Sequence, residues 1–178
     1  MSMPSAENKV TKNEINQLNQ EIENVVQENE DTLRNMYLTF RLGSESYGIE
    51  IRYVKEIVVM QKITVVPDTP MFVKGVVNLR GQVIPVLDMR LRFNMDSREY
   101  DQRTCIIVMN IEGVQVGLVV DTVNEVRNIE DDQISPPPRS AGADTARYIK
   151  GMGKVGEQVI ILLEGQHLLY ENEFGMLE

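Results

Sequence analysis

The chain has 178 residues, 42% of them hydrophobic, which is enough for one sizeable core or two small adjoining ones. A formal charge of −9, from 27 acidic against 18 basic side chains, argues against binding to the phosphate backbone of a nucleic acid. The single cysteine, Cys105, excludes an intramolecular disulfide, and the chain shows neither a signal peptide nor an apolar run near the ~20 residues that cross a bilayer. We therefore expect a cytoplasmic protein with at most two compact units.

The first predicted element is an amphipathic helix that ends near Asn35. TKNE from Thr11 fits a capping box, because Glu14 can bond back to the helix start. Apolar residues then recur at three- and four-residue steps, with polar Asn29 inside the stripe: Ile15, Leu18, Ile22, Val25 and Leu33. This narrow stripe can dock on the protein body or pair with a second copy, where Asn29 would suit a register-setting coiled-coil position. A partly solvated extension is the third alternative.

Past Met36 the apolar residues alternate, which predicts strands. Residues 37–42 and 47–51 are predicted to form a hairpin across a turn at 43–46, and further strands are predicted at 57–60, 74–79, 82–88, 104–111, 114–120, 148–155 and 158–163. Short strands separated by Gly, Pro and polar turns are typical of a small all-β barrel or sandwich. Residues 131–146, which include three consecutive prolines, are predicted to be a long surface loop.

The β region repeats itself. YGIEIRYVKEI at 47–57 aligns without gaps on VGLVVDTVNEV at 116–126, and KGVVNLRGQVIPVLD at 74–88 aligns on KGMGKVGEQVIILLE at 150–164. A repeat of this size is a whole supersecondary unit rather than a solenoid step. It predicts two similar β-barrels packed against each other.

Residues that differ between the two copies are free to carry function, whereas shared residues are expected to be scaffold. The predicted hairpin tip differs, since Asn78, Leu79, Arg80 and Gly81 align with Lys154, Val155, Gly156 and Glu157. An arginine at a tight turn is a permanently charged donor fork that suits a carboxylate or a carbonyl cluster on another protein. The alternative is an ordinary solvated side chain.

Nothing in the sequence forms a recognisable active site. Cys105 lies in an apolar run, which favours a small buried hydrophobe over a reactive thiol. His167 has no second His or Cys nearby, so we expect it to be structural or at the surface, and we expect no metal or cofactor. Glu56 and Glu125 occupy equivalent places in the two copies, so they would lie on separate barrels rather than form an acid–base pair. We predict no catalytic residues.

Three segments together resemble the CheW family of chemotaxis coupling proteins: FRLGSESYGIEIRYVKEI, TPMFVKGVVNLRGQVIPVLDMR and GLVVDTVNEV. The similarity runs from about Tyr37 to Leu169. It implies two five-stranded SH3-like β-barrels packed pseudo-symmetrically, with an additional N-terminal α-helix. Residues 1–35 would be the extension, and 36–178 a CheW-like domain of two interleaved barrels. It further implies a non-enzymatic adaptor that joins transmembrane chemoreceptors to the histidine kinase CheA, located in the cytoplasm at the membrane-associated receptor array.

The same resemblance indicates which residues meet the partners. The receptor-facing set, in which Arg80 is the first choice, is Val54, Glu56, Asn78, Leu79, Arg80 and Gly81. Lys74 and Gly75 are candidates for the face that binds the regulatory domain of CheA, although they can instead terminate a short helix after Pro70. The N-terminal helix departs from the family pattern, as a spacer or as an arm for self-association.

Other interpretations stay open. A CheV-like protein without its receiver domain, or a detached CheA regulatory domain, would share these motifs, but the chain ends at Glu178 without a receiver or kinase segment. An all-β enzyme with a small ligand between the barrels is an alternative from another class. SH3-like barrels also bind RNA, which the acidic charge opposes.

Overall fold

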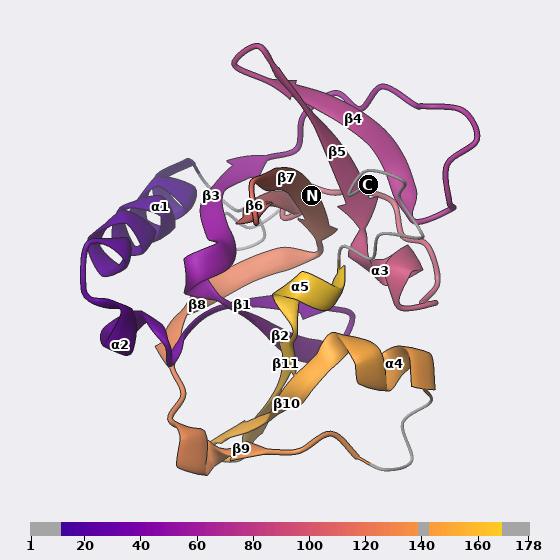
Figure 1. Cartoon of the computed structure of the whole chain (residues 1–178). Coiled ribbons are helices and arrows are strands. Elements are labelled where there is room, and N and C mark those ends of the chain that lie inside the picture. Colours follow the sequence, from indigo (N-terminus) through magenta and orange to yellow (C-terminus); the bar gives the residue numbers. More distant parts are fainter. Residues whose placement is uncertain (1–11, 139–142, 169–178) are drawn as a thin grey trace, which may run out of the picture.

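The computed structural model describes residues 12–138 and 143–168, which fold mainly into β-strands (Figure 1). Two sheets form the body, and short helices lie around them. The predicted all-β class is confirmed. Within the described ranges, no helix combines the length and apolar character needed to span a membrane.

The larger sheet has six strands in the order β8–β1–β2–β11–β10–β9, and the smaller has five in the order β3–β6–β7–β5–β4. The strands of the larger sheet are β1 (Met36–Leu42), β2 (Glu45–Glu50), β8 (Thr122–Asn128), β9 (Ile134–Ser135), β10 (Ile149–Val155) and β11 (Gln158–Leu163). Those of the smaller sheet are β3 (Val54–Val59), β4 (Val73–Leu79), β5 (Gln82–Asp88), β6 (Cys105–Ile111) and β7 (Val114–Val120). Neighbouring strands are antiparallel except in the parallel pairs β2–β11 and β5–β7.

The internal repeat explains both strand orders. The aligned segments make β2, β3, β4 and β5 the counterparts of β7, β8, β10 and β11, and chain order makes β1 the counterpart of β6. Replacing each strand of the smaller sheet by its counterpart gives β8–β1–β2–β11–β10, which is the larger sheet without β9. Each sheet therefore combines two strands of one copy with three of the other.

Alternate residues of a central strand face two different cores. In β6, Ile107 and Met109 belong to a large cluster that draws residues from both sheets, whereas Ile106 and Val108 belong to a cluster built from the five-stranded sheet. A third cluster lies on the larger sheet and contains Tyr37, Ile129, Ile160 and Leu162. Since both faces of β6 are buried, its sequence reads as a continuous apolar run.

The N-terminal segment forms two helices, α1 (Lys12–Val26) and α2 (Glu30–Leu33), so the prediction of a single helix ending near Asn35 is wrong. The Thr32 N–H donates to the side-chain oxygen of Asn29 at 3.0 Å, which makes Asn29 the N-cap of α2 rather than a coiled-coil position. Thr11 lies outside the described residues. The apolar stripe of α1 docks on the body of the protein, where Ile15, Leu18 and Ile22 are buried.

In the rest of the chain, some strands and helices begin and end where the sequence predicts and others do not. β5, β7 and β11 begin and end where predicted, but β8 is not predicted. The predicted loop at 131–146 contains a 3-10 helix (η3, Asp131–Gln133), β9 and the start of α4 (Ala143–Tyr148), and Tyr148 ends α4 instead of beginning β10. Residues 60–72, all described, form no helix after Pro70; Thr64 there makes an isolated bridge to Val76. The remaining short helices are η2 (Ile51–Tyr53), α3 (Met89–Arg92) and α5 (Gly165–Leu168).

Candidate functional site

The turn between β4 and β5 holds an arginine in an uncommon backbone conformation. Arg80 has a φ of 51° and Gly81 a φ of 86°, the two positive values of a tight hairpin turn. Positive φ is uncommon for a residue that has a side chain. The Gly81 N–H donates to the side-chain oxygen of Asn78 at 2.9 Å, which helps to fix the turn. The hairpin projects from the body and carries Arg80 at its tip (Figure 1).

Arg80 forms an ion pair with Glu56 of β3. Because β3 and β4 are the two outer strands of the five-stranded sheet, this pair links the hairpin at one edge of the sheet to the strand at the other edge. The Arg80 side chain is nevertheless 67% exposed, and that of Glu56 is 21% exposed. An ion pair this open contributes about 0–1 kcal/mol, so a carboxylate on another protein can replace Glu56 at little cost.

Four of the six predicted receptor-facing residues therefore come together at the surface, and two do not. Glu56, Asn78, Arg80 and Gly81 surround the hairpin tip, whereas Val54 and Leu79 are 5% and 8% exposed. Val54 belongs to the large central cluster and Leu79 to the cluster of the five-stranded sheet. Val54 and Leu79 therefore support this surface from the core and do not present their side chains to a partner.

The second copy of the repeat lacks the ion pair. Gly156 stands where the first copy has Arg80, with a φ of 62°. Glu125, the counterpart of Glu56, pairs instead with Arg127 on its own strand at 3.1 Å. Both hairpins have two-residue turns, but both turn residues of the first have a positive φ and only Gly156 does in the second. The two tips therefore differ in backbone conformation as well as in charge.

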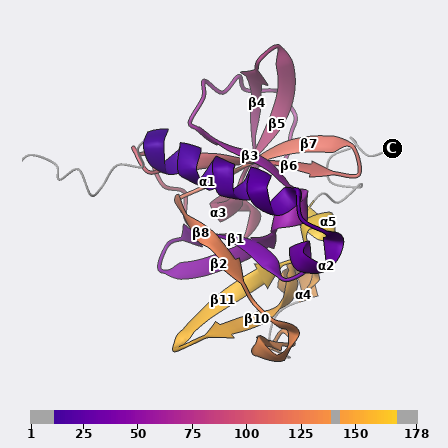
Figure 2. The ribbon, with the colours of Figure 1, turned by 90° about the vertical axis from the view of Figure 1, so that its left-hand side faces the viewer.

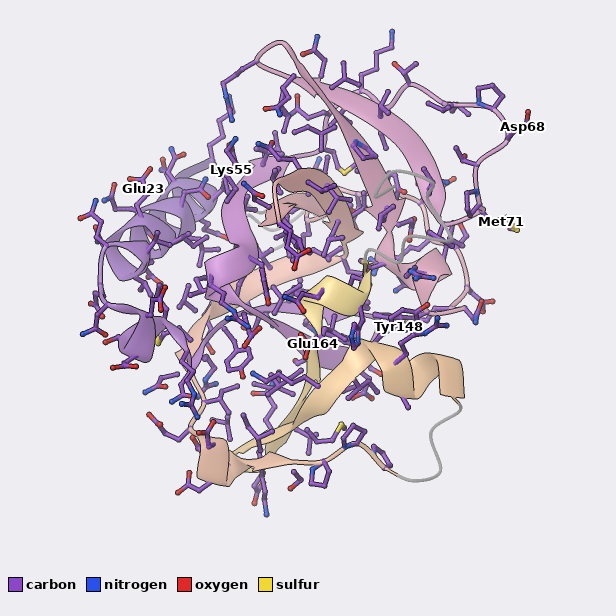
Figure 3. The ribbon with its side chains drawn as sticks, in the orientation of Figure 1. Glu23, Lys55, Asp68, Met71, Tyr148 and Glu164 are labelled. Atoms are coloured by element: carbon purple, nitrogen blue, oxygen red, sulfur yellow. The ribbon has the colours of Figure 1, made fainter. Side chains whose placement is uncertain are left out.

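Exposed apolar side chains lie on the β4–β5 hairpin and on the loop that leads into it, and the sequence analysis did not predict them. Val65, Met71 and Val83 are 78%, 83% and 64% exposed, on the loop between β3 and β4 and on β5. Met71 points away from the body on the outer loop (Figure 3). Such residues mark contact surfaces when they gather. The signal available in the sequence was the pair Val65–Val66 beside Pro67 and Asp68, apolar residues in a segment with no strand pattern.

Lys74 and Gly75 lie on β4 below the same loop. A Cβ on Gly75 would lie 2.1 Å from the carbonyl oxygen of Thr64, and its φ is 145°, so a glycine is needed where the loop crosses the strand. The Lys74 ammonium lies 5.8 Å from the centre of the Tyr100 ring. The structure gives Gly75 a packing role; the predicted kinase contact stays a prediction.

A polar cluster in the larger sheet surrounds the buried carboxylate of Glu50. Lys150 donates hydrogen bonds to the Tyr37 hydroxyl at 2.7 Å and to Glu50 at 2.9 Å, and Arg52 pairs with Glu50 at 3.2 Å. Burial alone would lower the pKa of Lys150, but the hydrogen bonds to Tyr37 and Glu50 outweigh it and raise that pKa. The cluster joins β1, β2 and β10 and satisfies its own charges, which is the arrangement of a structural contact.

The chain has one cysteine and one histidine, two residue types that often perform catalysis. Cys105 is buried as predicted, and burial raises the pKa of its thiol to about 11. His167 is exposed, and its Nδ1 lies 2.8 Å from the Arg147 carbonyl oxygen. The described residues include no group of three or more His, Cys, Asp or Glu side chains that could hold a metal ion. An apolar cavity beside Tyr47 and Phe93 has a volume of about 150 Å³, below the usual range of small-molecule sites.

The structure defines an all-β protein of two interleaved sheets with an exposed, charged hairpin tip. A family model described as the CheW-like domain matches residues 36–173. Chemotaxis protein CheW of Klebsiella aerogenes is 38% identical over 148 residues, which span 83% of this chain and 89% of the relative. Chemotaxis protein CheW of Treponema pallidum is 30% identical over 144 residues, 79% of this chain and 85% of the relative.

The chain belongs to the CheW family. A crystal structure of the scaffolding protein TtCheW from Thermoanaerobacter tengcongensis matches with a TM-score of 0.73 at 37% identity, covering 80% of this chain and 97% of the other. The role of the protein is that of a chemotaxis adaptor. Helices α1 and α2 precede the part of the chain that the family model matches.

Proposed function

We propose that this chain is a non-enzymatic adaptor that binds the cytoplasmic tips of chemoreceptors and the regulatory domain of the kinase CheA at the same time. It would act in the cytoplasm, at the receptor array. The observation that carries the receptor contact is the exposed Arg80–Glu56 pair at the β4–β5 tip, present in one copy of the repeat and absent from the other. Because the second copy folds without this ion pair, the fold does not require it, and its side chains are available to bind a partner.

The receptor contact combines charge with apolar surface. Arg80 and Glu56 offer one charge of each sign for orientation, and Val83 adds apolar area on the same hairpin. Charged groups at an interface mainly give specificity and orientation, while buried apolar groups give affinity. We assign the receptor contact to this tip, and the kinase contact to the surface around Lys74, near the opposite end of β4.

Signal transfer by such an adaptor needs no chemistry of its own. A partner can shift the kinase between conformations only through contacts that differ between those conformations. A body in which each copy of the repeat contributes strands to both sheets is suited to hold two partners in a fixed relation, because the two sheets are tied together by the chain and by a common core.

Replacing Arg80 by Glu tests the receptor contact. Arg80→Glu puts a second carboxylate beside Glu56, and we expect it to weaken binding of a receptor cytoplasmic fragment at least tenfold and to reduce CheA activation, with the fold intact. Lys154→Glu is the matched control, since it makes the same charge change near the tip of the other hairpin. Isothermal titration and a coupled kinase assay measure the two effects.

A double variant separates recognition from local structure. Arg80→Glu with Glu56→Arg restores an ion pair across the sheet but moves the guanidinium to the strand. We expect receptor binding to stay weak. If Arg80→Glu binds the receptor fragment as tightly as the wild type does, or weakens no more than Lys154→Glu, the assignment of Arg80 is wrong.

A further inference from the structure

Helix α1 lies in the gap between the two sheets. Its neighbours are the edge strands β3 and β8, one from each sheet, and α1 crosses between them (Figure 2). Ile15, Leu18 and Ile22 are 5%, 9% and 2% exposed and belong to the central cluster that both sheets share. The helix therefore fills an apolar groove whose walls are strands of the repeat.

Asn19 holds this helix to the edge of β3. Its side-chain nitrogen donates to the Ile57 carbonyl oxygen at 3.0 Å, and its side-chain oxygen accepts the Ile57 N–H at 2.8 Å. β3 pairs with β6 on one side only, so these two backbone groups face the open edge. The amide of Asn19 takes the place that a neighbouring strand would occupy.

The groove coincides with part of the proposed receptor surface. Val54 and Glu56 lie on β3, and Glu56 directly precedes the residue that Asn19 binds. Val54 is buried in the same central cluster as the apolar stripe of α1. The groove walls fall within residues 36–173, the segment matched by the family model, whereas α1 precedes that segment. The family domain thus provides the groove, and an added segment fills it.

We propose that α1 is an internal ligand, which occupies a helix-binding groove between β3 and β8 and must be displaced before a receptor helix can bind there. This inference rests on the proposed receptor function. The stripe of α1 indicates what the groove accepts: an amphipathic helix with apolar side chains at positions i, i+3 and i+7 and an amide at i+4, as in Ile15, Leu18, Ile22 and Asn19. The apparent affinity for the receptor is then reduced by the fraction of molecules in which the groove is open.

The first test weakens the hold on α1 without touching the groove walls. Asn19→Ala in the full chain removes both hydrogen bonds to Ile57, and we expect binding of a receptor cytoplasmic fragment to tighten about tenfold, as the loss of a bidentate contact implies. Glu23→Ala is the matched control, because this side chain lies on α1 and points away from the body (Figure 3). Unchanged or weaker binding by a folded Asn19→Ala protein would overturn the proposal.

Hydrogen exchange separates this inference from the proposed function. Without receptor, we expect α1 amides to exchange faster in Asn19→Ala than in the wild type, with β6 and β7 equally protected in both. If the exchange of α1 is unaffected, or if the strands lose protection together with it, α1 is an integral part of the core and the inference fails.

The complex with the receptor fragment gives a second test. In the wild-type complex we expect the α1 amides to lose protection. A complex in which α1 stays protected also overturns the inference. If α1 opens in Asn19→Ala but neither protein binds the fragment, the proposed receptor function is wrong. In that case a receptor helix is also wrong as the occupant of the groove.

Discussion

Arg80 has a positive φ, the region of backbone conformation that glycine adopts most readily. Its counterpart Gly156 has a similar φ and no Cβ, although Glu157 after it lacks the positive φ of Gly81. A left-handed conformation costs a residue with a side chain roughly 1–2 kcal/mol, and glycine carries no such penalty. A side chain kept in spite of this cost is better explained by recognition than by stability.

This cost leads to a prediction that separates stability from binding. We expect Arg80→Gly to leave the free energy of unfolding unchanged or to raise it by up to about 1 kcal/mol, since relief of the backbone offsets the loss of an exposed ion pair. Receptor binding should weaken as in Arg80→Glu. Urea denaturation measures the stability, and a loss of more than about 1 kcal/mol would assign a structural role to the Arg80 side chain.

Cys105 illustrates how burial determines the behaviour of a single thiol. Its pKa is raised by burial from an ordinary value of 9.0 to about 11. We expect the native protein at pH 8 to react with a thiol reagent only as fast as it unfolds, and to react at once in denaturant. Because the folded pKa is the higher one, its stabilising contribution is complete below pH 9 and is lost as the pH rises through 11. Rapid labelling of the native protein would contradict the burial.

At the scale of elements, the sequence predicts strands well where both faces are buried and poorly where only one is. β5, β7 and β11 are found at their predicted bounds. β8 was missed because its apolar residues, Val123 and Val126, are three apart and do not alternate, and its pairing with β1 contains a register shift near Leu38. The duplication could have found it, because β8 aligns with β3. The three- and four-residue spacing of apolar residues likewise could not show that Asn29 starts a new helix, because it continues to Leu33 in α2.

The polar cluster of the larger sheet gives a prediction with an internal control. Lys150→Met leaves the Glu50 carboxylate, 6% exposed, with only Arg52, and we expect it to lower the free energy of unfolding by about 2 kcal/mol. Lys74→Met changes the counterpart residue, whose ammonium only faces the Tyr100 ring, and should cost less than about 1 kcal/mol. Thermal and urea unfolding of both variants check the difference, and equal losses would contradict a structural role for the cluster.

At the scale of the whole molecule, the candidate site depends on contacts that no local pattern contains. The Arg80–Glu56 pair joins residues 24 apart in sequence and closes the five-stranded sheet from edge to edge. The sequence identified both residues by resemblance, and Arg80 also by comparison of the two copies, but not their mutual contact. The burial of Val54 could not be predicted either, since it results from packing between sheets that exchange strands.

Strand exchange predicts that the protein unfolds as one unit. We expect Ile84→Ala in the cluster of the five-stranded sheet and Leu162→Ala in the cluster of the larger sheet each to lower the free energy of unfolding by about 2–4 kcal/mol. Each should shift a single transition seen equally by hydrogen exchange in both sheets. Two separate transitions, with only the mutated sheet affected, would show that the sheets are independent.

Because each copy of the repeat contributes strands to both sheets, the fold also limits how the protein can be assembled from fragments. A break in the chain near residue 100, between the copies, would give two fragments. The first would hold two strands of the larger sheet and three of the smaller, and the second four of the larger, β9 included, and two of the smaller. Neither fragment could complete a sheet alone, and each would need the other to cover its exposed strand edges. A half-length chain carrying a single copy would meet the same need by trading strands with an identical molecule, so the present covalent repeat corresponds to a domain-swapped homodimer joined into one polypeptide.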